Sequence, residues 1–226
     1  MARRLPGFFL TFEGIDRSGK STQIDFTRRF LEARGVPVTV TREPGGTPLG
    51  QRLRALLLGH HGDGAAMAPT TELLLLAADR AEHVAKVIRP ALACGRVVIS
   101  DRYADSTVAY QGFGLGLDLE AVASVNRVAT EGLEPDLTIL LDVPVAMLQQ
   151  RARGVAFDRI EARGDDFYER VRQGFLFIAQ NESRRFVVLD GTQPPSVLQK
   201  RLTGILEEHV LSRVGPARPD KGGSGP

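Results

Sequence analysis

Short apolar runs alternate with longer amphipathic stretches along most of the chain. Five runs have the length and the β-branched or aromatic content of buried strands: 8–12, 36–40, 97–99, 137–142 and 186–189. Apolar residues recur at helical spacing between them, which predicts helices over 22–33, 49–57, 72–93, 119–130, 145–151, 167–181 and 196–210. Pro90 is expected to distort or end the third of these helices.

Strands that alternate with helices in this way predict an α/β fold. We expect a five-stranded parallel sheet with helices on both faces, in three layers. The length of 226 residues favours one domain, over residues 1–213. Residues 151–165 are charged, contain glycine and join two predicted helices, so they are expected to form a short lid, with a solvated loop as the alternative. Residues 214–226 are rich in glycine and proline and predict a disordered tail.

Composition narrows the functional classes. The 29 lysines and arginines against 27 acidic residues leave a net charge of +2, which argues against nucleic acid as a partner. The longest apolar stretch, Leu73 to Ala78, is too short to span a membrane. The single cysteine, Cys94, cannot form an internal disulfide, which favours a reducing, cytoplasmic location, and we expect its thiol to be buried or partly buried.

The segment between the first strand and the first helix matches G-x-x-x-x-G-K-[ST], the phosphate-binding loop. Its glycines allow a tight turn whose N–H groups face a phosphate, and the following helix N-terminus adds partial positive charge. Lys20 can reach the β- and γ-phosphates, and the Ser21 hydroxyl can ligate Mg²⁺. The expected ATP-binding residues are Gly14, Ile15, Asp16, Arg17, Ser18, Gly19, Lys20, Ser21 and Thr22.

Further cationic side chains follow or line the predicted strand ends. Arg42, Arg80 and Arg102 join Arg17 of the loop, and the segment 151–163 adds more arginines. Arginine suits bidentate contacts with phosphate, so this set favours a kinase with a phosphorylated acceptor. The alternative from a different class is a switch or regulatory ATPase that transfers phosphate only to water. A guanine-reading N-K-x-D-type segment does not occur in the chain.

Several separated segments make the chain resemble the thymidylate kinases. The phosphate loop within 12–23 and the run Thr41–Gly50 are similar to that family's first two signatures. Segment 101–112, with its Asp101-Arg102-Tyr103 start, and the lid segment 158–161 resemble the later ones, and 74–80 resembles the helix that lines the thymine pocket. The matches run in the family's order from about residue 8 to residue 190.

The resemblance implies transfer of the γ-phosphate of ATP to dTMP, giving dTDP, with Mg²⁺ as cofactor and a homodimer as the assembly. The implied catalytic residues are Asp16, Arg17, Lys20, Arg102 and Arg153. The implied substrate-binding residues are Asp16, Arg42, Leu76, Arg80, Arg102, Thr107, Tyr110 and Gln111. Among these, Asp16 would accept from the sugar 3′-hydroxyl or a metal-bound water, Arg102 would clamp the acceptor phosphate, and Arg80 would donate to a thymine carbonyl. Ser21 and Asp101 are the implied metal ligands.

Two departures from the family pattern leave questions open. Family members commonly place an aromatic residue at position 76 to stack on thymine, and this chain has Leu76. A kinase for another nucleoside monophosphate or for a deoxynucleoside therefore stays an alternative. The arginine that assists transfer comes from the phosphate loop or from the lid in this family, and the chain offers Arg17 as well as several lid arginines.

Overall fold

The computed structural model describes residues 5–59, 67–151 and 157–214. In these ranges, parallel strands form one five-stranded sheet in the order β2-β3-β1-β4-β5. The strands are β1 (Phe8–Glu13), β2 (Val38–Arg42), β3 (Val97–Asp101), β4 (Leu137–Asp142) and β5 (Phe186–Asp190). Each overlaps a predicted run, so the α/β fold class is confirmed.

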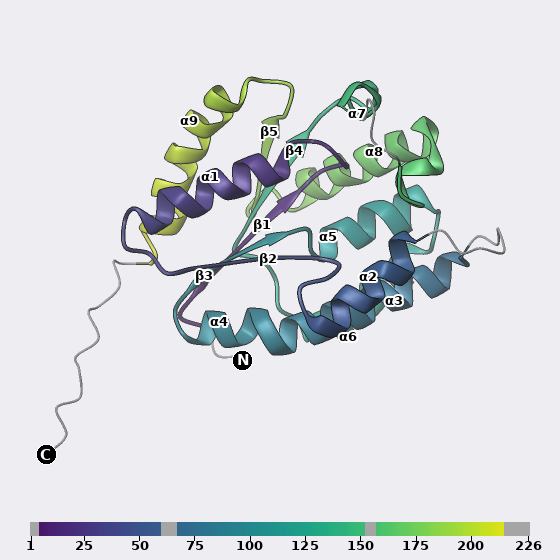
Figure 1. Ribbon diagram of the computed structural model, residues 1–226, viewed down its shortest axis with the longest axis horizontal. Coiled ribbons are helices and arrows are strands. Elements are labelled where there is room, and N and C mark those ends of the chain that lie inside the picture. Colours follow the sequence, from purple (N-terminus) through teal and green to yellow (C-terminus); the bar gives the residue numbers. More distant parts are fainter. Residues whose placement is uncertain (1–4, 60–66, 152–156, 215–226) are drawn as a thin grey trace, which may run out of the picture.

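Helices connect the strands and cover both faces of the sheet (Figure 1). The α-helices are α1 (Lys20–Glu32), α2 (Pro48–Leu58), α3 (Pro69–His83), α4 (Arg89–Ala93), α5 (Ala104–Thr107), α6 (Leu119–Thr130), α7 (Ala146–Arg151), α8 (Asp165–Asn181) and α9 (Pro195–Leu206). The described ranges also contain the π-helical segments η1 (Val84–Ile88), η2 (Val108–Gly114) and η4 (Glu207–Leu211) and the 3₁₀ turn η3 (Glu161–Arg163).

The central strand β1 is buried on both faces, which produces the three layers. Phe8, Leu10 and Phe12 point to one face and join the core formed with α1 and α9, to which Ile24, Leu31, Leu198 and Leu202 contribute. Phe9 points to the other face and packs with Val84, Ile88 and Leu92. A strand covered on both faces must be apolar at successive positions, which explains the unbroken apolar run.

The predicted helix over 72–93 is divided. Helix α3 ends at His83, and η1 shifts the hydrogen bonding so that the N–H of Arg89 donates to the carbonyl of Val84, five residues earlier. Helix α4 then begins at Arg89, with Pro90 in its first turn. Proline lacks an N–H, and a first turn is where its absence costs least, so the interruption precedes Pro90.

The prediction that the Cys94 thiol is buried or partly buried is wrong, because its side chain is exposed. Cys94 follows the last residue of α4, where the chain turns through Gly95 at a φ of 73°. The apolar face of this segment is formed by Ile88 and Leu92, and position 94 falls beyond it. No helix within 5–59, 67–151 or 157–214 has both the length and the apolar character needed to cross a bilayer.

The sheet topology places several candidate residues at one edge. Strand β1 pairs with β3 on one side and with β4 on the other, so β2 and β3 lie on one side of it and β4 and β5 on the other. The strand order therefore reverses at β1, which makes this point a topological switch point. Ligands bind at such a switch point, outside the carboxyl ends of the strands. The phosphate loop follows β1, Arg42 ends β2 and Asp101 ends β3 at this edge.

Candidate active site

The phosphate loop depends on its first glycine. Gly14 has a φ of 134°, and a Cβ placed there would lie 2.5 Å from the carbonyl oxygen of Leu141. Any side chain at this position would therefore strain the backbone and clash with β4. Gly19, at a φ of 103°, directly precedes α1 and turns the chain into the helix.

Lys20 is buried inside the curve of the loop. Its Nζ donates to the carbonyl oxygens of Gly14, at 3.1 Å, and Ile15, at 3.0 Å. Burial and the nearby Arg102 guanidinium lower the pKa of Lys20 to about 8. An anion in the loop would oppose both effects, so the ammonium is poised to pair with phosphate.

A cleft at the loop, here called the phosphate cleft, contains seven of the nine predicted ATP-binding residues and both predicted metal ligands. It is lined by Asp16, Arg17, Ser18, Gly19, Lys20, Ser21, Thr22, Arg42, Glu43, Arg54, Asp101 and Arg102. Gly14 and Ile15 do not line it and instead hold Lys20 through their carbonyl oxygens. Arg42, expected beside the acceptor, lies on this cleft and not on the neighbouring one.

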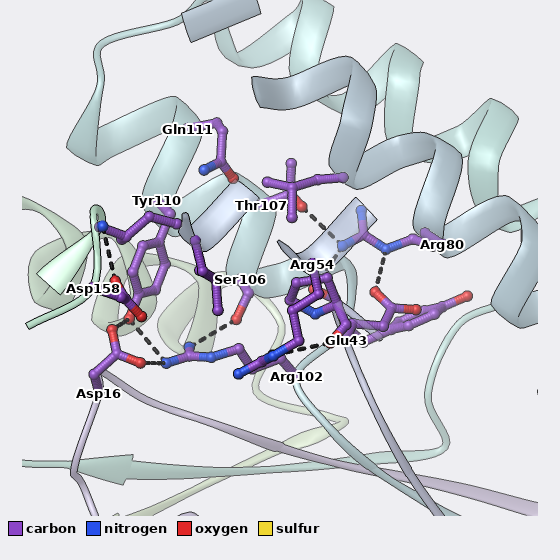
Figure 2. A pocket seen from close by; sticks show the side chains of 15 residues that line it. Asp16, Glu43, Arg54, Arg80, Arg102, Ser106, Thr107, Tyr110, Gln111 and Asp158 are labelled. Atoms are coloured by element: carbon purple, nitrogen blue, oxygen red, sulfur yellow. Dashed lines mark hydrogen bonds and ion pairs between the residues drawn. The ribbon is translucent and has the colours of Figure 1, made fainter. Parts of the chain in front are cut away.

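A second cleft, here called the acceptor cleft, lies next to it (Figure 2). It is lined by Asp16, Glu43, Pro44, Arg54, Leu58, Leu76, Arg80, Arg102, Tyr103, Ser106, Thr107, Tyr110, Gln111, Asp158 and Ile160. Seven of the eight implied substrate-binding residues are in this set, all but Arg42. Asp16, Glu43, Arg54 and Arg102 line both clefts, so the two sites meet at these side chains.

Asp16 accepts three hydrogen bonds at that junction. Arg102 donates to its Oδ1 at 2.6 Å, while the hydroxyls of Tyr110 and Tyr168 donate to its Oδ2 at 2.9 and 2.8 Å. Burial would raise the pKa of Asp16, but the charges of Arg102 and Lys20 outweigh it and hold the pKa well below its usual range. The carboxylate therefore stays ionised and acts as a fixed acceptor.

Arg102 adopts a backbone conformation that is unusual for its residue type, with a φ of 71°. Its Nη1 donates to the carbonyl of Gly14 and to the Ser106 hydroxyl, and its Nη2 to Asp16 and the Tyr110 hydroxyl. Such strain persists only where surrounding contacts hold it, and it gathers at functional sites. The guanidinium is thus fixed between the two clefts.

Glu13, the last residue of β1, is buried and holds residues that position Arg102. Its two carboxyl oxygens accept from the backbone N–H of Tyr103, at 2.8 Å, and from the Ser106 hydroxyl, at 2.6 Å. Burial and the nearby Asp105 raise the pKa of Glu13 to about 8. Glu13 therefore fixes the backbone at the start of α5 and the Ser106 hydroxyl, which accepts a hydrogen bond from Arg102.

Arg80 is almost fully buried at the base of the acceptor cleft. It donates to Glu43 at 2.8 Å, to Asn126 at 2.6 Å, and to the Tyr103 carbonyl and Thr107 hydroxyl at 3.1 and 2.9 Å. A guanidinium carries five N–H groups, and these bonds use four within the described ranges. One N–H, on Nη1, has no partner in these ranges, and Arg80 lines the acceptor cleft.

The described part of the segment expected to form a lid contacts the phosphate loop directly. Arg17 donates to both carboxylate oxygens of Glu161, at 3.2 and 3.1 Å, and its guanidinium lies 5.8 Å from the ring centre of Phe157. Arg151 donates to the carbonyl oxygen of Arg17 at 2.8 Å. Arg153 lies outside the described residues.

Arg54 and Tyr168 are among the residues of the site that were not predicted from the sequence. Arg54 of α2 lines both clefts and donates to the carbonyl of Pro44 at 2.9 Å, and burial and then Arg42 lower its pKa. Tyr168 of α8 contacts Asp16. A single arginine in a helix and a tyrosine 152 positions from its partner carry no local signal, so only the packing reveals them.

A phosphate loop at the switch point, beside a second cleft that shares cationic side chains with it, defines a P-loop phosphotransferase. The thymidylate kinase family model matches residues 12–202. The chain belongs to the thymidylate kinase family, as its motifs predicted.

Individual relatives agree with the family model. A thymidylate kinase of Desulfovibrio desulfuricans is 48% identical over 213 residues, covering 91% of this chain and 97% of the relative. One of Bifidobacterium longum is 52% identical over 189 residues, covering 83% and 91%. The crystal structure of thymidylate kinase from Ehrlichia chaffeensis matches with a TM-score of 0.72 at 34% identity, covering 89% of this chain and 98% of that one.

Proposed function

We propose that this protein transfers the γ-phosphate of ATP to dTMP, with ATP bound along the phosphate cleft and dTMP in the acceptor cleft. The observation that carries this assignment is the junction at Asp16 and Arg102, which line both clefts. A transferred phosphoryl group must lie between donor and acceptor, and a fixed guanidinium there stabilises the charge that it carries.

On the donor side, the loop N–H groups and Lys20 bind the β- and γ-phosphates. Ser21 and Asp101 fit an Mg²⁺ ion, because both line this cleft and Oδ1 of Asp101 is buried without a hydrogen-bond partner in the described ranges. Hydroxyl and carboxylate oxygens are the ligands that Mg²⁺ prefers, and the ion would neutralise phosphate charge when bound.

On the acceptor side, each group of dTMP has a matching side chain. Arg102 and Arg54 suit the phosphate, with Arg42 on the adjoining cleft. The Nη1 N–H of Arg80 suits a thymine carbonyl, and Leu76 covers the ring. Asp16 accepts from the sugar 3′-hydroxyl. Thr107, Tyr110 and Gln111 complete the sugar and base contacts.

The assay is ADP release with Mg-ATP and a panel of dTMP, dUMP, dCMP, GMP and thymidine. We expect dTMP to give the highest kcat/KM. Best turnover with another monophosphate or with thymidine would refute the acceptor while keeping the kinase. ADP release that no acceptor changes would indicate an ATPase. Removal of Mg²⁺ with EDTA should abolish turnover.

A homodimer through α2, α3 and α6 is supported by exposed apolar side chains. These helices pack beside one another at the surface (Figure 1). Their large exposed apolar residues are Leu49, Leu56, Leu74, Leu119 and Val128. An exposed apolar face of this kind suits an interface between subunits. Sedimentation analysis should give twice the chain mass, and Val128→Asp should shift it toward the monomer.

The functional unit is one kinase domain over 1–213 with its lid at 151–165, and it acts in the cytoplasm, where ATP and a reduced Cys94 are expected. A chain that ends at residue 213 should keep the kcat and KM of the full chain. A loss of activity on this truncation would show that residues 214–226 belong to the catalytic unit.

A further inference from the structure

Glu72, in the first turn of α3, is fully buried beside the acceptor cleft and joins three segments that are distant in the sequence. Its Oε1 accepts from Gln111 Nε2 at 2.9 Å and from Arg163 Nη1 at 3.0 Å. Its Oε2 accepts from Arg159 Nη2 at 2.6 Å and from Arg163 Nη2 at 2.5 Å. The carboxylate thus connects a cleft-lining amide to two arginines of the lid.

The arginines keep this buried group charged. Burial would raise the pKa of Glu72, but the hydrogen bonds from Arg163 and Arg159 outweigh it and lower the pKa below its ordinary value. An ionised carboxylate can only accept hydrogen bonds. Glu72 therefore requires a donor from each neighbour, including Gln111.

This requirement fixes which way the Gln111 amide faces. Its NH₂ group must point to Glu72, so its Oε1 faces away from that carboxylate. Oε1 is buried and has no hydrogen-bond partner in the described part of the chain. Gln111 lines the acceptor cleft together with Thr107 and Tyr110, and Figure 2 shows its amide at the upper end of that group. A residue that lines the cleft thus carries an acceptor that has no partner among the described residues.

An unpaired acceptor selects between pyrimidine bases. Thymine and uracil carry an N3–H donor, while cytosine presents a lone pair at the same atom. We propose that Glu72 is a positioning residue that sets the base preference by holding the Gln111 amide with its oxygen toward the base. This inference rests on the proposed placement of the dTMP base in the acceptor cleft.

The decisive measurement is the ratio of kcat/KM for dTMP to that for dCMP. Glu72→Gln keeps the shape but lets Gln111 bond in either orientation, so the ratio should fall about tenfold, mainly through a higher KM for dTMP. Gln111→Met removes both amide groups and should lower the ratio as well. In the Gln111→Met background, Glu72→Gln should change the ratio less than about twofold, because the two residues act as one unit.

A matched control exists on the surface of α8. Glu169 accepts from Gln173 Nε2 at 2.9 Å, the same carboxylate–carboxamide pair in an exposed position. Glu169→Gln should keep both kcat/KM values.

A second variant tests the role of the lid arginines and avoids removing the carboxylate. Arg163→Gln takes one cation from Glu72 and should raise its pKa. As the pH falls through that raised pKa, the protonated carboxyl can donate and Gln111 can turn over. The dTMP preference of Arg163→Gln should therefore fall with decreasing pH, while that of the wild type stays constant.

The outcomes distinguish a failure of the role given to Glu72 from a failure of the proposed base site. If Gln111→Met lowers the ratio and Glu72→Gln does not, the positioning role of Glu72 is refuted and the base site stands. If Gln111→Met changes neither the ratio nor the KM for dTMP, the base placement itself is wrong. Should Glu72→Gln lose the wild-type circular dichroism spectrum, a pH-independent ratio in Arg163→Gln refutes the inference alone.

Discussion

The hydroxyl of Tyr168 lies 2.8 Å from Oδ2 of Asp16 and donates to it, although 152 positions separate the two residues. Burial, followed by the charge of Asp16, raises the pKa of Tyr168, so the hydroxyl stays a donor at any working pH. Helix α8 thereby holds the one acidic side chain of the phosphate loop in place.

Replacement of this tyrosine should affect turnover more than folding. Tyr168→Phe removes one of the three described donors to the partly buried Asp16 carboxylate, a loss of about 1–2 kcal/mol, so kcat/KM for dTMP should fall roughly 5- to 30-fold. The KM for ATP should not change. Steady-state kinetics give both values, and Thr203→Ala, which removes a hydroxyl on α9, is the control. An unchanged kcat/KM for dTMP would contradict the role given to Tyr168.

The second prediction concerns the arginine that assists transfer. Arg17 lines the phosphate cleft as part of the loop, so it needs no lid movement to be near the phosphates. Arg17→Ala should lower kcat on the order of 10³-fold, and Arg153→Ala should lower it less. Single-turnover rates with saturating ATP measure the difference, and Arg28→Ala on the exposed side of α1 provides a surface control. Equal or reversed losses would assign the assisting arginine to the lid.

The third prediction concerns the base pocket. Leu76 lines the acceptor cleft where an aromatic ring could stack on thymine. Leu76→Phe should lower the dissociation constant of dTMP about 2- to 10-fold, because a stacked ring adds about 0.5–1.5 kcal/mol beyond its buried area. Isothermal titration measures this constant. Val197→Phe, at an exposed position of α9 outside both clefts, should leave it unchanged. Weaker binding by Leu76→Phe would mean that the cleft has no room for the ring.

The fourth prediction links stability to pH. Asp79 accepts from the N–H of Gly45, and burial and the nearby Glu43 raise its pKa from 3.8 to about 6 despite His83 and Arg80. A raised pKa means that the folded state binds the proton more tightly. Protonation of Asp79 therefore stabilises the folded state fully below pH 4, and this contribution is lost as the pH rises through 6.

Asp79→Asn imitates the protonated acid and removes this dependence. Its unfolding free energy relative to the wild type should rise by roughly 2–3 kcal/mol between pH 4 and pH 7. Urea unfolding at several pH values measures the difference. Asp190→Asn is the control, because Asp190 is exposed and its pKa is lowered to about 2. The unfolding free energy of this variant relative to the wild type should not rise between pH 4 and pH 7. Parallel pH profiles for Asp79→Asn and the wild type would refute the assignment.

The sequence determined the order of the elements, the phosphate loop and the family, because each depends on residues that are close together in the chain. A strand buried on both faces needs successive apolar residues such as Phe8 to Phe12, and the loop needs glycine where β4 approaches, so both leave a contiguous pattern. The segment around Asp101 and Arg102 is likewise local, and the structure places it at the predicted sheet edge.

Only the tertiary structure decided which distant side chains meet. The contacts of Tyr168 with Asp16 and of Glu72 with Arg163, the place of Arg54 between the clefts and that of Arg42 on the phosphate cleft all depend on how helices are rotated and packed on the sheet. The exposure of Cys94 depends on where α4 ends. Helical periodicity gives the face of a residue on its own helix but not the partner that the face will meet, because that partner is set by packing across the whole domain.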